Sequence, residues 1–196
     1  MTVRQCGKKS NHGLNYQEGP GRFALINELA IPEAQRIIDL YTKEAYPGLT
    51  RWWAETAFKL RQTRTLVNCF GRKWLFKGPL NDETLRQAIS FVPQSTVVDM
   101  VNRGLIQMDK NLPRMKPLIQ KHDEILYSYR FDQASHCFDD LNTLCGYISP
   151  VVEYGGRRFD IKNEFSCGLS WGGLQKVEIN EQSVRKAIEE MASVRT

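Results

Sequence analysis

Four residues near the start of the chain recur at intervals of four: Arg4, Lys8, His12 and Tyr16. In an α-helix this spacing places the side chains on nearly one face. Two fixed cations and an imidazole in one row are unfavourable unless an anion or water neutralises them. The row also begins near the positive end of the helix dipole, which stabilises phosphate groups. We therefore expect a helix over residues 3–17 that binds a polyphosphate, with a solvated basic face as the alternative.

The tripeptide His122-Asp123-Glu124 lies between two extended, apolar-rich runs, residues 116–119 and 125–129. This pattern predicts a tight antiparallel hairpin with the three polar residues at its turn. A hard cation such as Mg²⁺ takes oxygen ligands and keeps several waters, so one or two carboxylates suffice when substrate phosphates supply the rest. Asp123 is the stronger candidate ligand because its side chain is short, and Glu124 would support it. The alternative is a polar turn without a ligand.

The apolar pattern and the turn residues predict an α+β chain, with helices first and an antiparallel sheet with packed helices afterwards. Thr2, Asn81 and Asn180 are candidate helix N-caps. The expected helices, besides the first, run over residues 22–29, 32–46, 52–60, 82–111 (kinked at Pro93), 134–148 and onward from 181. The expected strands run over residues 63–68, 73–76, 116–121 and 125–130, with another pair between 151 and 164.

Composition narrows the classes of function. The chain has 196 residues, a net charge of +5 and an isoelectric point near 9.0, which mildly favours a polyanionic partner. Its five cysteines include no C-x-x-C pair, which fits reduced thiols better than a disulfide framework or a zinc site. We find no signal peptide and no apolar run long enough to span a bilayer, so we expect no membrane partner.

Taken together, residues 4–171 resemble the family A DNA polymerases, the group of bacterial DNA polymerase I and its phage relatives. The family's fingers helix reads Arg-x-x-x-Lys-x-x-x-aromatic-Gly-x-x-Tyr-Gly, and its last palm motif is His-Asp-Glu in a turn. The matching residues here are Arg4, Lys8, His12, Gly13 and Tyr16, then His122, Asp123 and Glu124. Residues 86–96 resemble the palm helix that touches the template-primer, and Gly168-Leu-Ser-Trp171 resembles the C-terminal Gly-x-x-Trp.

The resemblance implies a role for each matching residue. Arg4 and Lys8 would hold the phosphates of the incoming deoxynucleotide, and Lys8 would donate a proton to the departing pyrophosphate. His12 would pack on the nucleotide and Tyr16 would lie near the templating base. Asp123 would bind Mg²⁺, with Glu124 beside it. The residues expected to contact the DNA primer-template are Arg86, Ser90, Gln94, Gln120 and His122. Residues 1–80 would form the fingers, and residues 81–196 the C-terminal part of the palm with a short helical tail.

The chain also departs from the family pattern. His12 stands where the family has Phe or Tyr, Gln17 replaces the Gly after Tyr16, and Ser90 replaces an amide residue. The family's first palm motif, an aspartate-containing strand, has no counterpart among these 196 residues. We therefore expect this chain to be the C-terminal part of a polymerase, either a fragment or, as we favour, the C-terminal subunit of a split, phage-type polymerase. An N-terminal subunit would supply the thumb and the second aspartate of a two-metal Mg²⁺ site, in the cytoplasm of the host.

Two other classes of function remain open. A polymerase-derived module could bind nucleic acid without catalysis, but Lys8 and Asp123 would then have no purpose. A free-standing metal-dependent phosphohydrolase would need a second carboxylate near Asp123, and the sequence offers no evident one.

Overall fold

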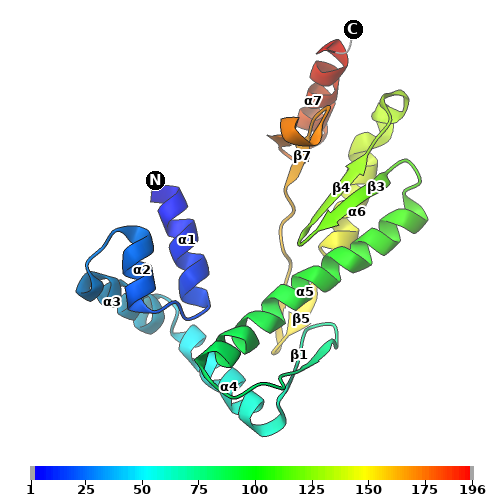
Figure 1. The fold of residues 1–196 in the computed structure, drawn as a ribbon. Coiled ribbons are helices and arrows are strands. Elements are labelled where there is room, and N and C mark those ends of the chain that lie inside the picture. The colour runs from blue at the N-terminus through cyan, green and yellow to red at the C-terminus, as the bar shows by residue number, and fades with distance from the viewer. Residues whose placement is uncertain (1–2, 195–196) are drawn as a thin grey trace. The chain divides into compact units, whose positions relative to one another are not determined.

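The computed structural model describes residues 3–194 of the chain. The chain divides into two compact units, Met1–Ser95 and Thr96–Thr196, and each is described by itself. The long helix α5 (Asp82–Asn111) contributes to both. Helices precede small antiparallel sheets along the chain, so the predicted α+β fold is confirmed (Figure 1). Thr2, the candidate cap of the first helix, lies outside the described residues.

The first unit is helical apart from one hairpin. Its elements are α1 (Val3–Asn15), α2 (Pro20–Asn27), α3 (Ile31–Asp39), the π-helix η1 (Leu40–Ala45), α4 (Pro47–Thr63), β1 (Thr65–Val67), β2 (Lys73–Leu75) and the start of α5. One core cluster joins α1, α2 and α3 through Leu14, Phe23, Ala24 and Ala34. A second joins α4, the hairpin and α5 through Leu60, Leu66, Phe76, Ala88 and Val92. Each end of the unit therefore has its own core.

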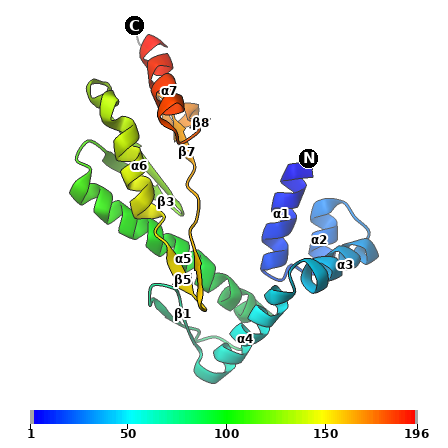
Figure 2. The ribbon, with the colours of Figure 1, turned by 180° about the vertical axis from the view of Figure 1, so that it is seen from behind.

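The second unit packs hairpins and helices around one core. Its further elements are β3 (Lys116–Lys121), β4 (Glu124–Ser128), the 3₁₀-helix η2 (Phe131–His136), α6 (Cys137–Ile148), β5 (Val152–Tyr154), β6 (Arg157–Phe159), β7 (Phe165–Cys167), η3 (Trp171–Gly173), β8 (Gln175–Val177) and α7 (Glu181–Val194). The core is formed by α5, α6 and α7, with Met108, Leu141, Leu144 and Val184 at its centre. Both views show α6 lying beside the β3–β4 hairpin (Figure 2).

Several predicted elements are confirmed, because strong local signals set them. Asn81 caps α5 by accepting a hydrogen bond from the amide of Thr84 at 2.9 Å, and Asn180 caps α7 by accepting one from Ser183 at 2.8 Å. The hairpins β1–β2 and β5–β6 lie inside the predicted strand pairs. Pro93 lies inside α5, which continues past it.

Other boundaries were wrong. The helix expected over residues 22–29 begins at Pro20, whose fixed φ suits a first helical position, and ends at Asn27 because Glu28 turns left-handed at φ 57°. The helix expected over 32–46 becomes a π-helix after Asp39. There the Tyr46 amide bonds to the Tyr41 carbonyl at 2.8 Å and the two rings pack 4.7 Å apart, a pairing that the wider π turn allows.

Further corrections concern the second unit. The helix expected from Ala134 starts as the 3₁₀-helix η2 and becomes α-helical only at Cys137. The hairpin β7–β8, which encloses Gly168-Leu-Ser-Trp171, was not expected. Gly168 has no room for a Cβ atom, which would lie 2.6 Å from the carbonyl oxygen of Gly173. A glycine at this position lets the two ends of the loop approach closely.

Candidate nucleotide and metal site

The cationic row lies on the exposed surface of α1. Arg4, Lys8 and His12 are all exposed and follow one another at single-turn spacing. The opposite side of the helix is held by Leu14, which is buried against Phe23 and Ala34. None of the three row residues has a carboxylate partner within the described residues. The row therefore presents positive charge that no carboxylate of residues 3–194 pairs with.

His12 and Tyr16 are brought into direct contact. Their ring centroids lie 5.2 Å apart in an edge-to-face arrangement at 69°. Tyr16 stands just beyond the end of α1 at Asn15, and not within the helix as the spacing predicted. The helix stops there because Gln17 adopts a left-handed backbone at φ 61°. The Gly13 carbonyl accepts hydrogen bonds from the amides of Tyr16 and Glu18, which closes the turn.

The C-terminal end of α1 is tied to the rest of the first unit. The indole of Trp53 on α4 donates to the Asn15 carbonyl at 3.1 Å, and the Tyr41 hydroxyl donates to the Asn15 side chain at 3.0 Å and also to Asn11. The Glu18 side chain packs over Gly13, where a Cβ atom would lie 2.0 Å from its carboxylate oxygen and would displace it. These contacts fix the turn that carries Tyr16.

The carboxylate turn forms as predicted. Strands β3 and β4 pair from Lys116↔Ser128 to Lys121↔Glu124, which leaves His122 and Asp123 as a two-residue turn. His122 takes the left-handed conformation at φ 54°, and its carbonyl accepts a hydrogen bond from Gln120 Nε2 at 3.3 Å. Asp123 is exposed at the tip. Glu124 is the first residue of β4, and not part of the turn itself.

The tip fits a hard divalent cation only in part. Asp123 and Glu124 are adjacent exposed carboxylates, and neither has an ion-pair partner within residues 3–194. Magnesium is commonly held by one or two carboxylates together with water and substrate phosphates, so this donor set suits it. No group of three or more His, Cys, Asp or Glu side chains in the described part of the chain is arranged to hold a metal ion. A two-metal site would therefore need further ligands.

A buried network that the sequence did not reveal supports the hairpin. Asp140 on α6 accepts two hydrogen bonds from Arg114 and a third from the Tyr129 hydroxyl at 2.7 Å, just after β4. Burial raises the pKa of Asp140, but the bonds from Arg114 and Tyr129 outweigh it and leave the pKa below its ordinary value. Burial also raises the pKa of Tyr129 well above its ordinary value. This network anchors the base of the hairpin to α6.

The residues expected to contact DNA are divided between the two units. Arg86, Ser90 and Gln94 recur at four-residue intervals on α5 within the first unit. Arg86 pairs with Glu83 at 3.4 Å, and the Ser90 hydroxyl donates to the Gln87 carbonyl at 3.0 Å. Gln120 and His122 belong to the second unit, together with Asp123 and Glu124, whereas Arg4, Lys8, His12 and Tyr16 belong to the first.

None of the helices between residues 3 and 194 combines the length and the apolar character that a bilayer span requires. The first unit presents an exposed cationic helix, and the second unit presents an exposed acidic turn. An exposed cationic helix suits an anionic ligand, and adjacent exposed carboxylates suit a hard cation.

Comparison with known proteins identifies the family. The family model of DNA polymerase family A matches residues 1–171, and the chain belongs to this family. It is 28% identical over 134 residues to the DNA polymerase of Mycobacterium phage D29 and 23% identical over 132 residues to DNA polymerase I of Helicobacter pylori. These alignments cover 67% and 63% of this chain, but only 21% and 15% of the two relatives. The chain thus spans about a fifth of the length of the phage relative.

A solved structure shows the same fold. The POL domain of Pol1 from M. smegmatis, in complex with DNA primer-template and dNTP, aligns with a TM-score of 0.66 at 17% identity. The alignment covers 74% of this chain and 27% of that one. At this identity the likeness establishes the fold, which agrees with the family assignment.

Proposed function

We propose that this chain supplies the nucleotide-binding helix and one metal-binding carboxylate of a template-directed DNA polymerase. In this proposal residues 1–80 are the fingers, and residues 81–196 are the C-terminal part of the palm with a helical tail. The proposal rests on one observation: a chain of DNA polymerase family A carries an exposed Arg4–Lys8–His12 row on α1 and an exposed Asp123 at a hairpin tip. The substrates are a deoxynucleoside triphosphate and a DNA primer-template, in the cytoplasm of the host if the gene belongs to a phage.

The cationic row would bind the triphosphate of the incoming deoxynucleotide. The guanidinium of Arg4 can fork onto two phosphate oxygens, and the ammonium of Lys8 is a compact charge that can also deliver a proton. The primer 3′ hydroxyl would lose its proton to solvent as its oxygen bonds to the α-phosphorus, and Lys8 would protonate the pyrophosphate oxygen as its bond to that phosphorus breaks. His12, already in contact with Tyr16, would offer its ring face to the nucleotide. The fixed turn after α1 would hold Tyr16 near the templating base.

The carboxylate turn would hold Mg²⁺. When bound, the metal would neutralise developing charge on the phosphate and promote the nucleophilicity of the primer hydroxyl. Asp123 would be the ligand and Glu124 its neighbour in support. Gln120 and His122, at the same hairpin tip, would contact the primer terminus, while Arg86, Ser90 and Gln94 on α5 would contact the template-primer duplex.

Catalysis would require a second carboxylate from outside these 196 residues. In support, the described residues place only Asp123 and Glu124 together at the tip, and no larger cluster of potential ligands forms elsewhere in residues 3–194. We propose that an N-terminal polymerase subunit with the thumb and the first palm aspartate supplies this group. The alternative function is a nucleic-acid-binding module without catalysis, which the small number of carboxylates would also suit.

The test is primer extension by this chain in complex with the polypeptide that carries the other aspartate. We expect Mg²⁺-dependent incorporation of deoxynucleotides by the complex, and none by the 196-residue chain alone. Extension by the chain alone would contradict the need for a partner. A complex that binds primer-template but incorporates nothing at any Mg²⁺ concentration would favour the non-catalytic module.

A further inference from the structure

One segment of the first unit concentrates positive charge. Residues 56–81, which include the end of α4 and the β1–β2 hairpin, contain no Asp or Glu. Six cations lie within the same stretch, which alone exceeds the net charge of +5 of the whole chain: Lys59, Arg61, Arg64, Arg72, Lys73 and Lys77. A basic block with no acidic residue attracts polyanions and is not part of the nucleotide or metal site described above.

An aromatic side chain stands exposed in the middle of this block. Trp74 lies between Lys73 and Lys77 on β2 and is 57% exposed. Neither lysine has a carboxylate partner within the described residues. At this exposure the ring of Trp74 is accessible to a flat apolar ligand.

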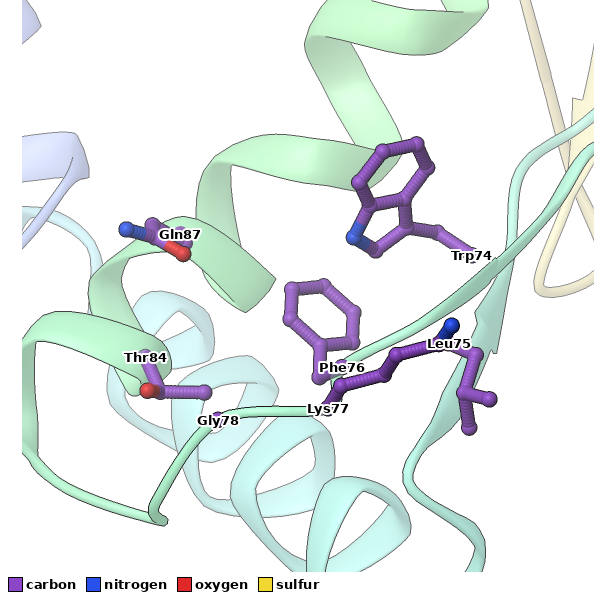
Figure 3. Close-up of a pocket in the computed structure, with 7 residues that line it drawn as sticks. All are labelled: Trp74, Leu75, Phe76, Lys77, Gly78, Thr84 and Gln87. Atoms are coloured by element: carbon purple, nitrogen blue, oxygen red, sulfur yellow. The ribbon is translucent and has the colours of Figure 1, made fainter.

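Trp74 forms one wall of a pocket of about 480 Å³. The lining residues come from β2, the segment after it and the start of α5: Trp74, Leu75, Phe76, Lys77, Gly78, Thr84 and Gln87 (Figure 3). In the close-up the rings of Trp74 and Phe76 lie on the same side of the strand, facing α5. The pocket volume falls within the range of small-molecule sites, about 300–1,000 Å³. The site therefore joins an apolar, aromatic wall to a cationic rim.

The pocket rests on a rigid support. Phe76 is buried and packs edge-to-face on Phe91 of α5 at 6.1 Å, while the Trp74 ring lies 6.4 Å from Phe91. The turn before Trp74 is closed by the Asn68 side chain, which accepts hydrogen bonds from the amides of Phe70 and Arg72, both at 2.9 Å. The ring is thus held in place without being covered.

The other end of β2 is fixed as well. The amide of Phe76 donates to the Arg64 carbonyl at 2.8 Å, and the Arg64 guanidinium donates to the Gly78 carbonyl at 2.5 Å. In the sequence, Asp82 and Glu83 directly follow the segment, and Glu83 is engaged by Arg86 and by Gln87. Lys77, which lines the pocket, and Lys73, which precedes Trp74 on β2, therefore keep their positive charge within the described residues.

We propose that this pocket binds an unpaired nucleotide of single-stranded DNA, with the base stacked on Trp74 and the adjoining phosphates near Lys73 and Lys77. Charge complementarity selects a polyanion, and the exposed ring beside a pocket selects a polyanion with flat apolar groups. This inference deepens the proposed function, on which it rests for its DNA partner, because it assigns a site to the unpaired part of the template. Stacking of this kind is tolerant of base identity.

The test is fluorescence anisotropy of a labelled oligodeoxythymidylate with the full chain, without Mg²⁺ or deoxynucleotides. Trp74→Ala should weaken binding by between about fivefold and a hundredfold, the range for losing one stacked base. The matched control is Trp171→Ala, since Trp171 is exposed to a similar degree, 54%, in the second unit. The affinity of Trp171→Ala for the oligonucleotide should stay within about twofold of wild type, which is about the experimental error of such a comparison.

Two further variants separate stacking from charge and from folding. Trp74→Phe, which keeps an aromatic face, should restore most of the affinity, whereas Trp74→Leu should not. Lys73→Ala combined with Lys77→Ala should lower the slope of log affinity against log salt by about 1.4, the value for two phosphate contacts to a single strand. Circular dichroism should show unchanged helix content in each variant.

The binding measurements can support or overturn the proposal. Equal affinity of wild type and Trp74→Ala would overturn the proposal, as would equal competition by polyglutamate of matched charge, which would indicate an acidic protein partner. If the complex fails to extend a primer but Trp74→Ala still weakens oligonucleotide binding, only the proposed function is contradicted. If the complex extends a primer but Trp74→Ala binds the oligonucleotide like wild type, only this inference is contradicted.

Discussion

Arg114 and Asp140 form a two-pronged ion pair, with Nε to Oδ2 at 2.6 Å and Nη2 to Oδ1 at 2.5 Å. The aspartate side chain is buried on α6, whereas the arginine follows α5 and is partly exposed. The hydroxyl of Tyr129 completes the set of donors to Asp140. Because Tyr129 follows β4 directly, this pair determines where the β3–β4 hairpin, and with it Asp123, is attached to the second unit.

We predict that Asp140→Asn destabilises the chain by about 2–3 kcal/mol. The substitution leaves the donors of Arg114 and Tyr129 without the carboxylate that accepts their hydrogen bonds. Because Arg114 is partly exposed, the loss of stability is smaller than for a fully buried pair. The measurement is the midpoint of urea unfolding. The matched control is Asp132→Asn, which removes an exposed ion pair with Arg130 and should leave the midpoint unchanged. An unshifted midpoint for Asp140→Asn would show that the network contributes nothing.

The same pair predicts a dependence of stability on acid. The pKa of Asp140 is lowered in the folded chain from its ordinary value of 3.8. A lowered folded pKa adds stability that is fully present above about pH 5 and is lost as the pH falls through the folded pKa. The difference in unfolding free energy between wild type and Asp140→Asn should therefore shrink steadily below about pH 4. A difference that stays constant from neutral pH into this acidic range would contradict the assignment.

The network also shows what sequence reasoning can reach. Asn81 and Asn180 were identified as caps because a cap depends on residues within three positions of it. The β3–β4 hairpin was predicted because two extended runs flank a polar turn. Arg114 and Asp140 are 26 residues apart, and nothing in either local sequence indicates the partner. Pairings of this kind are set by tertiary packing.

The remaining differences have similar causes. The π-helical turn at Leu40–Ala45 depends on a contact between Tyr41 and Tyr46, which competes with the ordinary α-helical pattern. Gln17 occupies a left-handed position that usually favours Gly, so its residue type does not mark the end of α1 at Asn15, two residues before the expected end. The roles of the site residues and the division at residue 80 stay predictions.

For the metal ligand, we predict that Asp123→Asn in the complete polymerase complex lowers the rate of primer extension by at least about a thousandfold. Loss of a ligand removes several kcal/mol of transition-state stabilisation in phosphoryl transfer. Binding of primer-template should persist, because Asp123 lies at an exposed turn whose fold does not depend on it. Single-turnover extension and a binding titration measure the two effects. Glu124→Gln is the comparison and should cost less, and an Asp123→Asn rate within tenfold of wild type would remove Asp123 from the site.

For the cationic row, we predict that Lys8→Ala lowers the maximal rate of incorporation by about a hundredfold to ten-thousandfold, whereas Arg4→Ala chiefly weakens deoxynucleotide binding. A proton donor acts in the transition state, but a phosphate clamp also binds the ground state. Lys9→Ala is a matched control, since Lys9 is an exposed lysine on the same helix but off the row. Pre-steady-state kinetics should leave Lys9→Ala unchanged. Equal, small effects of all three variants would indicate a solvated basic face.

The last prediction concerns the surface by which this chain would join its partner. Within the described residues, β3 pairs only with β4, and its apolar residues Leu118 and Ile119 are 59% and 41% exposed. An open strand edge with apolar side chains is a template for pairing with another chain. We expect a partner subunit to extend this sheet and to bury more than about 2,000 Å² in all, as obligate interfaces do. Hydrogen exchange of the β3 amides on the open edge, which do not bond to β4, should be fast in the isolated chain and slow in the complex, and Leu118→Lys should weaken assembly. If β3 exchanges equally slowly in both states, the partner does not dock at this edge.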